Sequence, residues 1–557
     1  MTLVLAALIA AADPVAAYRE VQRANVAGDQ ARARIATVVR ALSDASMPRT
    51  ATVLLAALAA DPEQSDGVRA AARAELALRA TEDPALANQL LADQADPGRL
   101  PPALAVVIAR GHLERALQLA PPEEGAAFET LPQQPVSLQP ASAGQAPPAL
   151  DKELADAMGA VAPEPPPVPA SEPQQKLPAA AQRELDVARA LAATVPPADP
   201  NAGDAREVAA LAALASGDVA SAKKEFLAVA ELPVRRDDAA AAQRRDKAYL
   251  QLARLAYQSG DDALAATLYE GVGRGAPEWL DALFEASWAH FRRGEDEKAL
   301  GNLLTLHAPF FQERFFPESF VLKALVLYEN CRYRDARASL AEFQQRYQPL
   351  HDALAQAASG LRTPQAGWEL LIRGPVGLQQ AVPAAAREEM ARIEQDDDIR
   401  GALVAASQLA QEIDSIDRRP EPFRSSALIS RVAPLARQAR LRLLETAGQR
   451  LISRVNAERA TLRELIAQSL RLSYEIAGRE KELASNPDAA LTARAHNEPP
   501  KVAEDEELWP FQGEYWRDEL GSYRYQLGQR CKRPRAPLPT AAQPARTPEK
   551  VAGTPEK

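Results

Sequence analysis

A glycine and an alanine recur at a spacing of 34 residues in the middle of the chain. Gly260 is followed by Gly294 at this distance, and Ala265 is followed by Ala299. The period is typical of a helix–turn–helix repeat, in which glycine permits a left-handed turn and alanine lets two helices cross closely. The pattern therefore predicts stacked helical hairpins.

One more hairpin is expected on each side of this block. Gly217 and Ala222 keep the local pattern upstream, and Cys331 and Ala336 occupy the turn and the small position downstream. Ala336 comes 37 residues after the preceding alanine, so three residues are added, which we place in the aromatic loop 307–317. The alternative is a set of antiparallel hairpins without a common repeat.

The composition agrees with an all-α fold. Alanine is abundant, whereas aromatic residues make up only 5 % of the 557 residues, which favours helix over sheet. Two cysteines exclude a disulfide-built scaffold and a zinc site of the Cys₄ or Cys₂His₂ type. A net charge of −10 argues against nucleic acid as a partner. We expect no cofactor and no metal.

The first residues predict export. Residues 1–12 contain an apolar run from Leu3 that ends in the small residues Ala10 and Ala12, the form of a signal peptide with its cleavage site. The run is too short to span a membrane, and no membrane span is expected elsewhere. The alternative is a first amphipathic helix of the mature domain. The predicted location is periplasmic or outer-envelope associated, in a bacterium.

The remaining chain divides into segments of different composition. We expect helical-hairpin repeats first, then a largely disordered proline-rich linker, because 14 prolines lie within 121–178. A proline-rich ligand for a partner domain is the alternative for that linker. The expected order is hairpins at 13–120, linker at 121–200, repeats at 201–350, a long helical hairpin at 351–485, an aromatic segment at 486–529 and a disordered basic tail at 530–557.

Heptad spacing marks the long hairpin. Six of the eight seam positions are apolar, and their 4–3 spacing is typical of a coiled coil; the positions are Leu451, Val455, Glu458, Leu462, Leu465, Ser469, Leu472 and Ile476. We expect an antiparallel partner helix within the chain. The alternative is a homo-oligomer formed through 383–485.

Two groups of aromatic residues are candidates for a partner surface. The first lies in the aromatic loop and the second in the C-terminal aromatic segment, which we expect to dock onto the long hairpin or the repeats; the candidates are Phe310, Phe311, Phe315, Phe316, Trp509, Phe511, Tyr515 and Trp516. The alternative for the loop is a small satellite of the core. Cys331 and Cys531 could form a disulfide that ties this segment to the repeats.

Residues 204–349 resemble tetratricopeptide-repeat (TPR) proteins. Two blocks, 299–333 and 510–521, are more narrowly similar to envelope TPR proteins associated with gliding motility in myxobacterial-type cells. The broader resemblance implies a TPR-like helical solenoid. The narrower one implies a structural part of a cell-envelope assembly, with a role in motility.

No catalytic motif is present. The five histidines are scattered, and none is followed by a second histidine at helical i+4 spacing. We therefore predict a non-enzymatic exported adaptor that binds other envelope proteins and no small-molecule substrate. The alternatives are a coiled-coil oligomeric structural protein and, third, a helical enzyme acting on the cell wall.

Overall fold

The computed structural model describes most of the chain as helices. The described residues are 13–23, 28–80, 82–91, 100–119, 177–235, 237–485, 502, 504, 506–508 and 510–527. They contain helices and no strand, which confirms the all-α prediction. The predicted signal peptide, most of the proline-rich linker and the basic tail lie outside the described residues.

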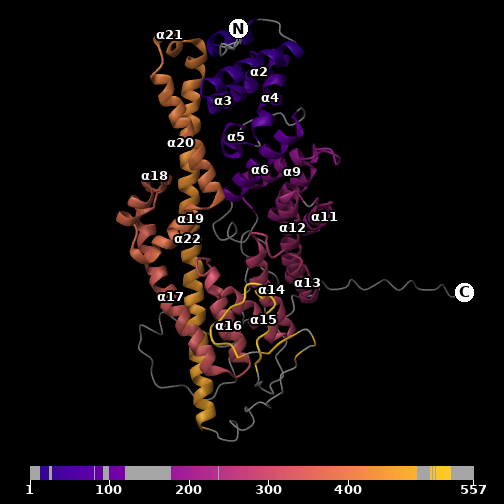
Figure 1. The fold of residues 1–557 in the computed structure, drawn as a ribbon, viewed down its shortest axis with the longest axis vertical. Helices are drawn as coiled ribbons and strands as arrows, with labels where there is room; N and C mark the ends of the chain where they lie inside the picture. The colour runs from indigo at the N-terminus through magenta and orange to yellow at the C-terminus, as the bar shows by residue number, and fades with distance from the viewer. Residues whose placement is uncertain are drawn as a thin grey trace, which may run out of the picture. The chain divides into compact units, whose positions relative to one another are not determined.

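The chain forms two compact units, each built from two separate stretches of sequence. Unit 1 combines residues 1–233 with 344–467, and unit 2 combines 234–343 with 468–557. Helices α17 (Tyr333–Gly360) and α22 (Ala427–Ser485) contribute residues to both units. Figure 1 shows α22 as a long continuous helix.

The other helices of unit 1 fall into an N-terminal and a later group. The N-terminal group comprises α1 (Pro14–Gln22), α2 (Asp29–Asp44), α3 (Pro48–Ala60), α4 (Asp66–Ala80), α5 (Pro84–Leu91), α6 (Pro102–Leu119), α9 (Ala179–Ala193), α10 (Ala202–Ala215) and α11 (Val219–Ala230). The later group comprises α18 (Pro364–Ala381), η4 (Ala384–Ala386), α19 (Arg387–Glu394), α20 (Asp397–Asp417) and α21 (Glu421–Arg424).

Unit 2 is built around consecutive hairpins. Its helices are α12 (Ala239–Gln258), α13 (Asp262–Glu270), α14 (Trp279–Arg293), α15 (Asp296–Leu306), the short 3₁₀ helix η3 (Pro309–Phe311) and α16 (Pro317–Glu329). Helices α12 to α15 pack in chain order, each against the next.

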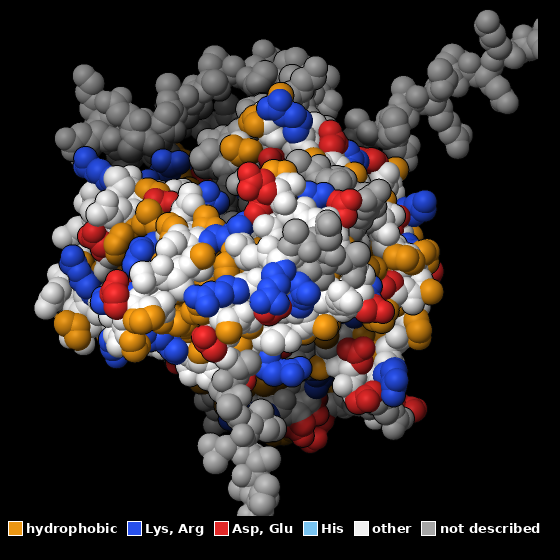
Figure 2. Space-filling view, turned by 90° about the horizontal axis from the view of Figure 1, so that it is seen from above, with side chains coloured by type: hydrophobic (Ala, Val, Ile, Leu, Met, Phe, Trp, Pro, Cys, Tyr) orange, Lys and Arg blue, Asp and Glu red, His pale blue; other side chains and the backbone are white. Residues whose placement is uncertain are grey.

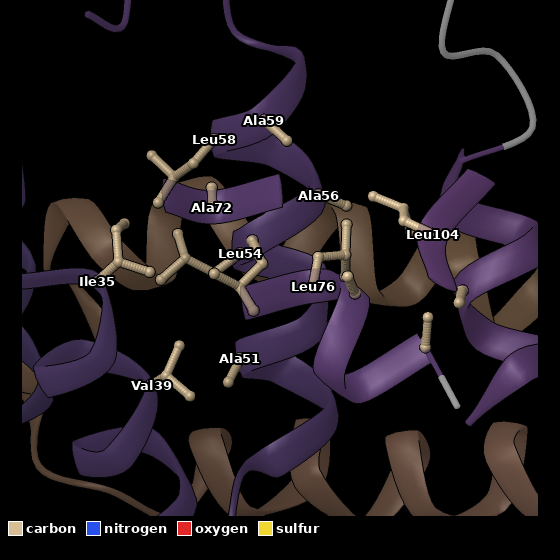
Figure 3. Close-up of a cluster of buried hydrophobic side chains, with 14 of the residues drawn as sticks. Ile35, Val39, Ala51, Leu54, Ala56, Leu58, Ala59, Ala72, Leu76 and Leu104 are labelled. Carbon is tan, nitrogen blue, oxygen red and sulfur yellow. The ribbon is translucent and has the colours of Figure 1, made fainter. Parts of the chain in front are cut away.

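The core of unit 1 joins residues that are far apart in the sequence. Ile35, Leu54, Leu76 and Leu104, from four N-terminal helices, are at most 1 % exposed, and Figure 3 shows Leu54 and Leu76 between Ile35 and Leu104. Leu428, from the start of α22, belongs to the same cluster. The N-terminal helices and the first turns of α22 therefore share one hydrophobic core.

A buried carboxylate closes the N-terminus of α3. Met47, at the cap position, makes no side-chain capping bond, but Glu412 of α20 supplies one from across the unit. Its carboxylate accepts the N–H of Arg49 at 3.0 Å and the N–H of Thr50 at 2.7 Å. These are unsatisfied first-turn donors of the helix, so Glu412 replaces the local cap.

Helix α20 runs antiparallel to the first part of α22. Asp398, at the start of α20, pairs with Arg450, whereas Asp417, at its end, lies 3.9 Å from Arg437. All eight seam positions predicted between Leu451 and Ile476 are buried, with exposed fractions of 7 % or less. Helices α20 and α22 are therefore antiparallel between Arg437 and Arg450 of α22, which lie before the predicted seam.

Helix α9 lies within the range that we assigned to the proline-rich linker. Its Leu185, Ala188 and Leu191 are at most 2 % exposed and join the unit 1 core. No proline lies between Pro178 and Pro196, and this alanine- and leucine-rich stretch can form an amphipathic helix. The described part of the linker range is therefore folded from residue 179 onward.

The four predicted hairpin turns share one backbone conformation. Gly217, Gly260 and Gly294 have φ of +79°, +82° and +77°, and Cys331 has φ of +58° at the corresponding place. In each turn the next residue donates its N–H to the carbonyl five residues earlier, at 2.8–2.9 Å. This is the closing bond of a Schellman-type helix end. The four small residues, Ala222, Ala265, Ala299 and Ala336, are completely buried.

The face drawn in Figure 2 carries mixed charge. Acidic and basic side chains are interspersed with hydrophobic ones among the residues shown in colour.

Candidate interaction surface

The last described part of the chain lies along α15. We call residues 510–527 the C-terminal strap. The N–H of Gly521 donates to Thr305 Oγ1 at 2.9 Å, and the N–H of Tyr525 donates to the Glu297 carbonyl, also at 2.9 Å. Figure 1 draws the strap in yellow near α15 and α16. The chain's own C-terminal segment therefore occupies one side of α15.

The strap follows α15 in a regular antiparallel register. Every second strap residue contacts the next turn of α15. Residues 521, 523 and 525 of the strap contact residues 305, 301 and 297 of α15 in that order. Four helical residues rise about 6 Å, and two extended residues span about 6.6 Å. This match lets the backbone of the strap contact the helix at each successive turn.

Two glycines make the close approach possible. Gly301 lies within α15, where a Cβ would overlap the carbonyl oxygen of Tyr523 and lie 2.5 Å from its carbonyl carbon. Gly521 has φ of +87°, and a Cβ there would come within 2.8 Å of the Trp279 ring. A glycine inside a helix costs about 0.5–1 kcal/mol relative to alanine. Strap docking gives the glycine at position 301 a structural reason.

Two arginines hold the strap from loops of unit 2. Arg274, between α13 and α14, donates from Nη1 to the Asp518 carbonyl at 2.8 Å. Arg332, between α16 and α17, donates from Nη1 to the Leu527 carbonyl at 2.9 Å. Both bonds go to backbone oxygens and fix the path of the strap, and Arg274 also donates from Nη2 to the Ser522 hydroxyl at 2.5 Å.

An apolar cluster lies beneath the strap. Leu520, Tyr523 and Ala308 are buried in it, and the partly buried side chains packed against it are Trp279, Leu304, Phe311 and Tyr515. Burial raises the pKa of the Tyr515 and Tyr523 hydroxyls above the usual range. The Tyr523 hydroxyl also accepts the N–H of Trp516 at 2.9 Å and donates to the Trp516 carbonyl at 3.1 Å.

The aromatic loop divides between packing and exposure. Phe311 packs edge-on against Trp279 with ring centroids 6.1 Å apart, and Phe316 lies 5.9 Å from Phe284. Phe315 is also partly buried, whereas Phe310 is 45 % exposed. The satellite-core reading therefore fits three of the four phenylalanines, and Phe310 remains on the surface.

The C-terminal candidates divide in the same way. Phe511 and Trp516 are each 45 % exposed, Tyr515 is partly buried, and Trp509 lies outside the described residues. Phe511 contacts Tyr515 edge-on with centroids 5.2 Å apart.

The loop and the strap meet through Phe310. The guanidinium of Arg517 lies 4.7 Å from the Phe310 ring centroid, a cation–π contact. We call Phe310, Phe511 and Trp516 the aromatic rim. Two groups of aromatic residues predicted separately from the sequence therefore contribute to one surface region of unit 2.

Cys331 occupies a strained turn beside the end of the strap. It adopts a left-handed conformation that the equivalent turns give to glycine, and its sulfur is disulfide-bonded. The adjacent Arg332 holds the Leu527 carbonyl, so the strap arrives next to this cysteine. The other cysteine of the chain, Cys531, lies outside the described residues, and its pairing with Cys331 stays a prediction.

Buried ionic groups elsewhere form pairs both within one helix and between neighbouring helices. Arg392 of α19 contacts both Glu389 and Glu458, and burial, together with the charge of Glu389, raises the pKa of Glu458 to about 8. In unit 2, Arg254 donates to both oxygens of Glu285, at 2.6 Å and 2.9 Å. In the part of the chain that the structure describes, no group of three or more potential ligands could hold a metal ion.

The comparisons with known proteins leave the chain without a family assignment. No protein-family model matches it, and no curated protein matches it. Among the described helices, none combines the length and the apolar character that crossing a membrane requires.

Four residues that position the strap were not singled out from the sequence. Gly301, Gly521, Arg274 and Arg332 make or permit its backbone contacts. One local signal was present, because a glycine within a helix is unfavourable and calls for a packing reason. The arginines carried no such signal, since their acceptors lie 195 and 244 residues away.

Proposed function

We propose that the protein is a non-enzymatic adaptor of the bacterial cell envelope. In this proposal, TPR-like hairpins form a rigid scaffold, and the aromatic rim binds a segment of another envelope protein. The four turns of common geometry and their buried alanines support the repeat assignment. A role in gliding motility follows from the resemblance of 299–333 and 510–521.

The observation that carries the proposal is the exposure of the rim. Phe310, Phe511 and Trp516 each keep 45 % of their surface in solvent although the strap that holds two of them is anchored along α15. Large aromatic side chains on a well-supported backbone are the residues that dominate binding at protein interfaces. Anchoring the strap reduces the entropy that these side chains lose on binding.

Export is part of the same proposal. A disulfide at Cys331 supports an oxidising compartment such as the periplasm. The apolar run within 1–12 supports passage across the inner membrane as a signal peptide.

The test is affinity capture from crosslinked envelope fractions. The wild-type protein is compared with a triple variant, Phe310→Ala, Phe511→Ala and Trp516→Ala, and with Tyr474→Ala, which removes an aromatic that is 50 % exposed on α22. We expect an envelope protein that is captured by wild type and by Tyr474→Ala and is lost with the triple variant. Direct binding of that purified protein then measures the affinity.

An unchanged capture profile with the triple variant would contradict a role for the rim. Circular dichroism of each variant shows whether the helical fold is intact, so that loss of capture is not caused by unfolding.

A further inference from the structure

The aromatic rim lies in the most acidic part of the C-terminal region. Residues 504–519 contain seven acidic residues and one basic residue. Glu507, Asp518 and Glu519 are exposed, and no ion pair among the described residues includes them. The described surface around the rim is therefore acidic, and these three carboxylates have no basic partner among the residues that the structure describes.

The nearby arginines compensate only part of this charge, because one of them forms an ion pair with an acidic residue of this segment. Arg274 binds the backbone carbonyl of Asp518 and not its carboxylate. Arg524 pairs with Glu506 at 2.8 Å, and Arg517 stacks over Phe310. The stacked guanidinium also shows that a rim aromatic accepts a cation on its face.

An apolar or acidic partner would fit this surface poorly. Covering Asp518 and Glu519 with apolar groups would remove water from carboxylates without supplying a hydrogen bond or a counter-charge. An acidic segment would add like-charge repulsion. A cationic side chain can make two favourable interactions here. It can stack on the exposed ring of Trp516 or Phe511, and it can form an ion pair with a neighbouring carboxylate.

We propose that the aromatic rim binds an arginine- or lysine-rich segment of the partner protein. The inference deepens the proposed adaptor function and rests on it. Arginine fits better than lysine, because its planar guanidinium can stack on an aromatic ring while it donates to a carboxylate.

The experiment measures binding of defined peptides to the full-length protein. A labelled twelve-residue peptide that alternates arginine with alanine is compared with its glutamate-for-arginine analogue by fluorescence anisotropy. The variants are Trp516→Ala and the double change Asp518→Asn with Glu519→Gln, and Tyr474→Ala is the matched control. Each variant is first checked for an intact strap through slow amide exchange at Gly521.

We expect the arginine peptide to bind at least about tenfold more tightly than the glutamate peptide, which corresponds to about 1.4 kcal/mol. Trp516→Ala should weaken binding of the arginine peptide about tenfold, within the range of interface hot spots. The double change should weaken binding and flatten its dependence on salt. Tyr474→Ala should leave binding unchanged.

Equal affinity for the two peptides, or equal affinity of wild type and Trp516→Ala, would overturn the inference. A chain truncated after Arg533, which keeps Cys531, tests the basic tail as a rival occupant. Tighter peptide binding after truncation would assign the rim to the tail and overturn the assignment to a partner. If the arginine peptide does not bind but capture of an envelope protein still depends on the rim, the adaptor proposal stands and the proposed preference for a cationic segment is rejected.

Discussion

Replacing Gly301 with alanine should release the strap. An added Cβ would overlap the Tyr523 carbonyl oxygen and lie 2.5 Å from its carbon, and both atoms belong to the strap backbone. Neither can rotate away as a side chain would. The strap must therefore move as a unit, which disturbs its hydrogen bonds to Thr305 and Glu297.

The magnitude follows from two opposing effects. Overpacking of a tight contact costs about 1–3 kcal/mol, which lowers the equilibrium constant for strap docking by about 5- to 150-fold. Alanine within a helix gains about 0.5–1 kcal/mol over glycine. The second effect stabilises α15 whether or not the strap is docked, so local release of the strap is more informative than global stability.

Limited trypsin digestion measures the released population. Arg524 is an exposed residue of the strap, and cleavage after it should require the strap to leave α15. In Gly301→Ala we expect the rate of this cleavage, followed by mass spectrometry, to rise by about 5- to 150-fold. The rise should occur while the helical circular dichroism signal of the rest of the chain is retained.

Gly478→Ala provides the matched control in the same unit. Gly478 is exposed within α22, and an added Cβ there meets nothing within 4 Å. This variant should gain about 0.5–1 kcal/mol of stability and cleave after Arg524 at the wild-type rate. If Gly301→Ala behaves like Gly478→Ala, with a gain in stability and no change in cleavage, the docked strap is refuted.

Three further predictions test other contacts. The pKa of Glu458 is raised to about 8 from an ordinary 4.5, so this group contributes stability below pH 4.5 that is lost as the pH rises through 8. In urea unfolding, Glu458→Gln should therefore be as stable as wild type at pH 5 and more stable than wild type at pH 9. A stability difference that does not depend on pH would contradict this. Gly448 of α22 lies so close to α18 that a Cβ added in Gly448→Ala would overlap the Pro364 carbonyl oxygen. This variant should destabilise unit 1 by about 1–3 kcal/mol. Unchanged urea unfolding would contradict the close crossing of the two helices. Non-reducing peptide mapping should link Cys331 to Cys531, and alkylation of both cysteines without reductant would disprove the pairing.

Features fixed by local chemistry could be predicted from the sequence. Gly260 and Gly294 mark turns because left-handed backbone is favourable for glycine, and both turns have positive φ. The heptad positions from Leu451 to Ile476 are buried because a periodic apolar face must pack somewhere. The period did not determine which elements cover that face.

Long-range contacts could not be predicted in the same way. Glu412 caps α3 across 362 residues, and nothing in either local sequence connects the two sites. The strap was expected to dock on the long hairpin or the repeats, but its register depends on Gly301, a single missing Cβ. Folding of α9 within the linker range reflects a change in composition after Pro178 that the proline count of 121–178 obscured.

Amide hydrogen exchange in the wild-type strap tests the central claim most directly. The N–H groups of Gly521 and Tyr525 are bonded to α15, whereas the N–H of Gln512, in the exposed first part of the strap, donates to the Glu514 side chain two residues away. We predict that the first two exchange at least about 100-fold more slowly than unstructured amides, with Gln512 much less protected. Exchange of Gly521 and Tyr525 at the unstructured rate would contradict docking of the strap on α15.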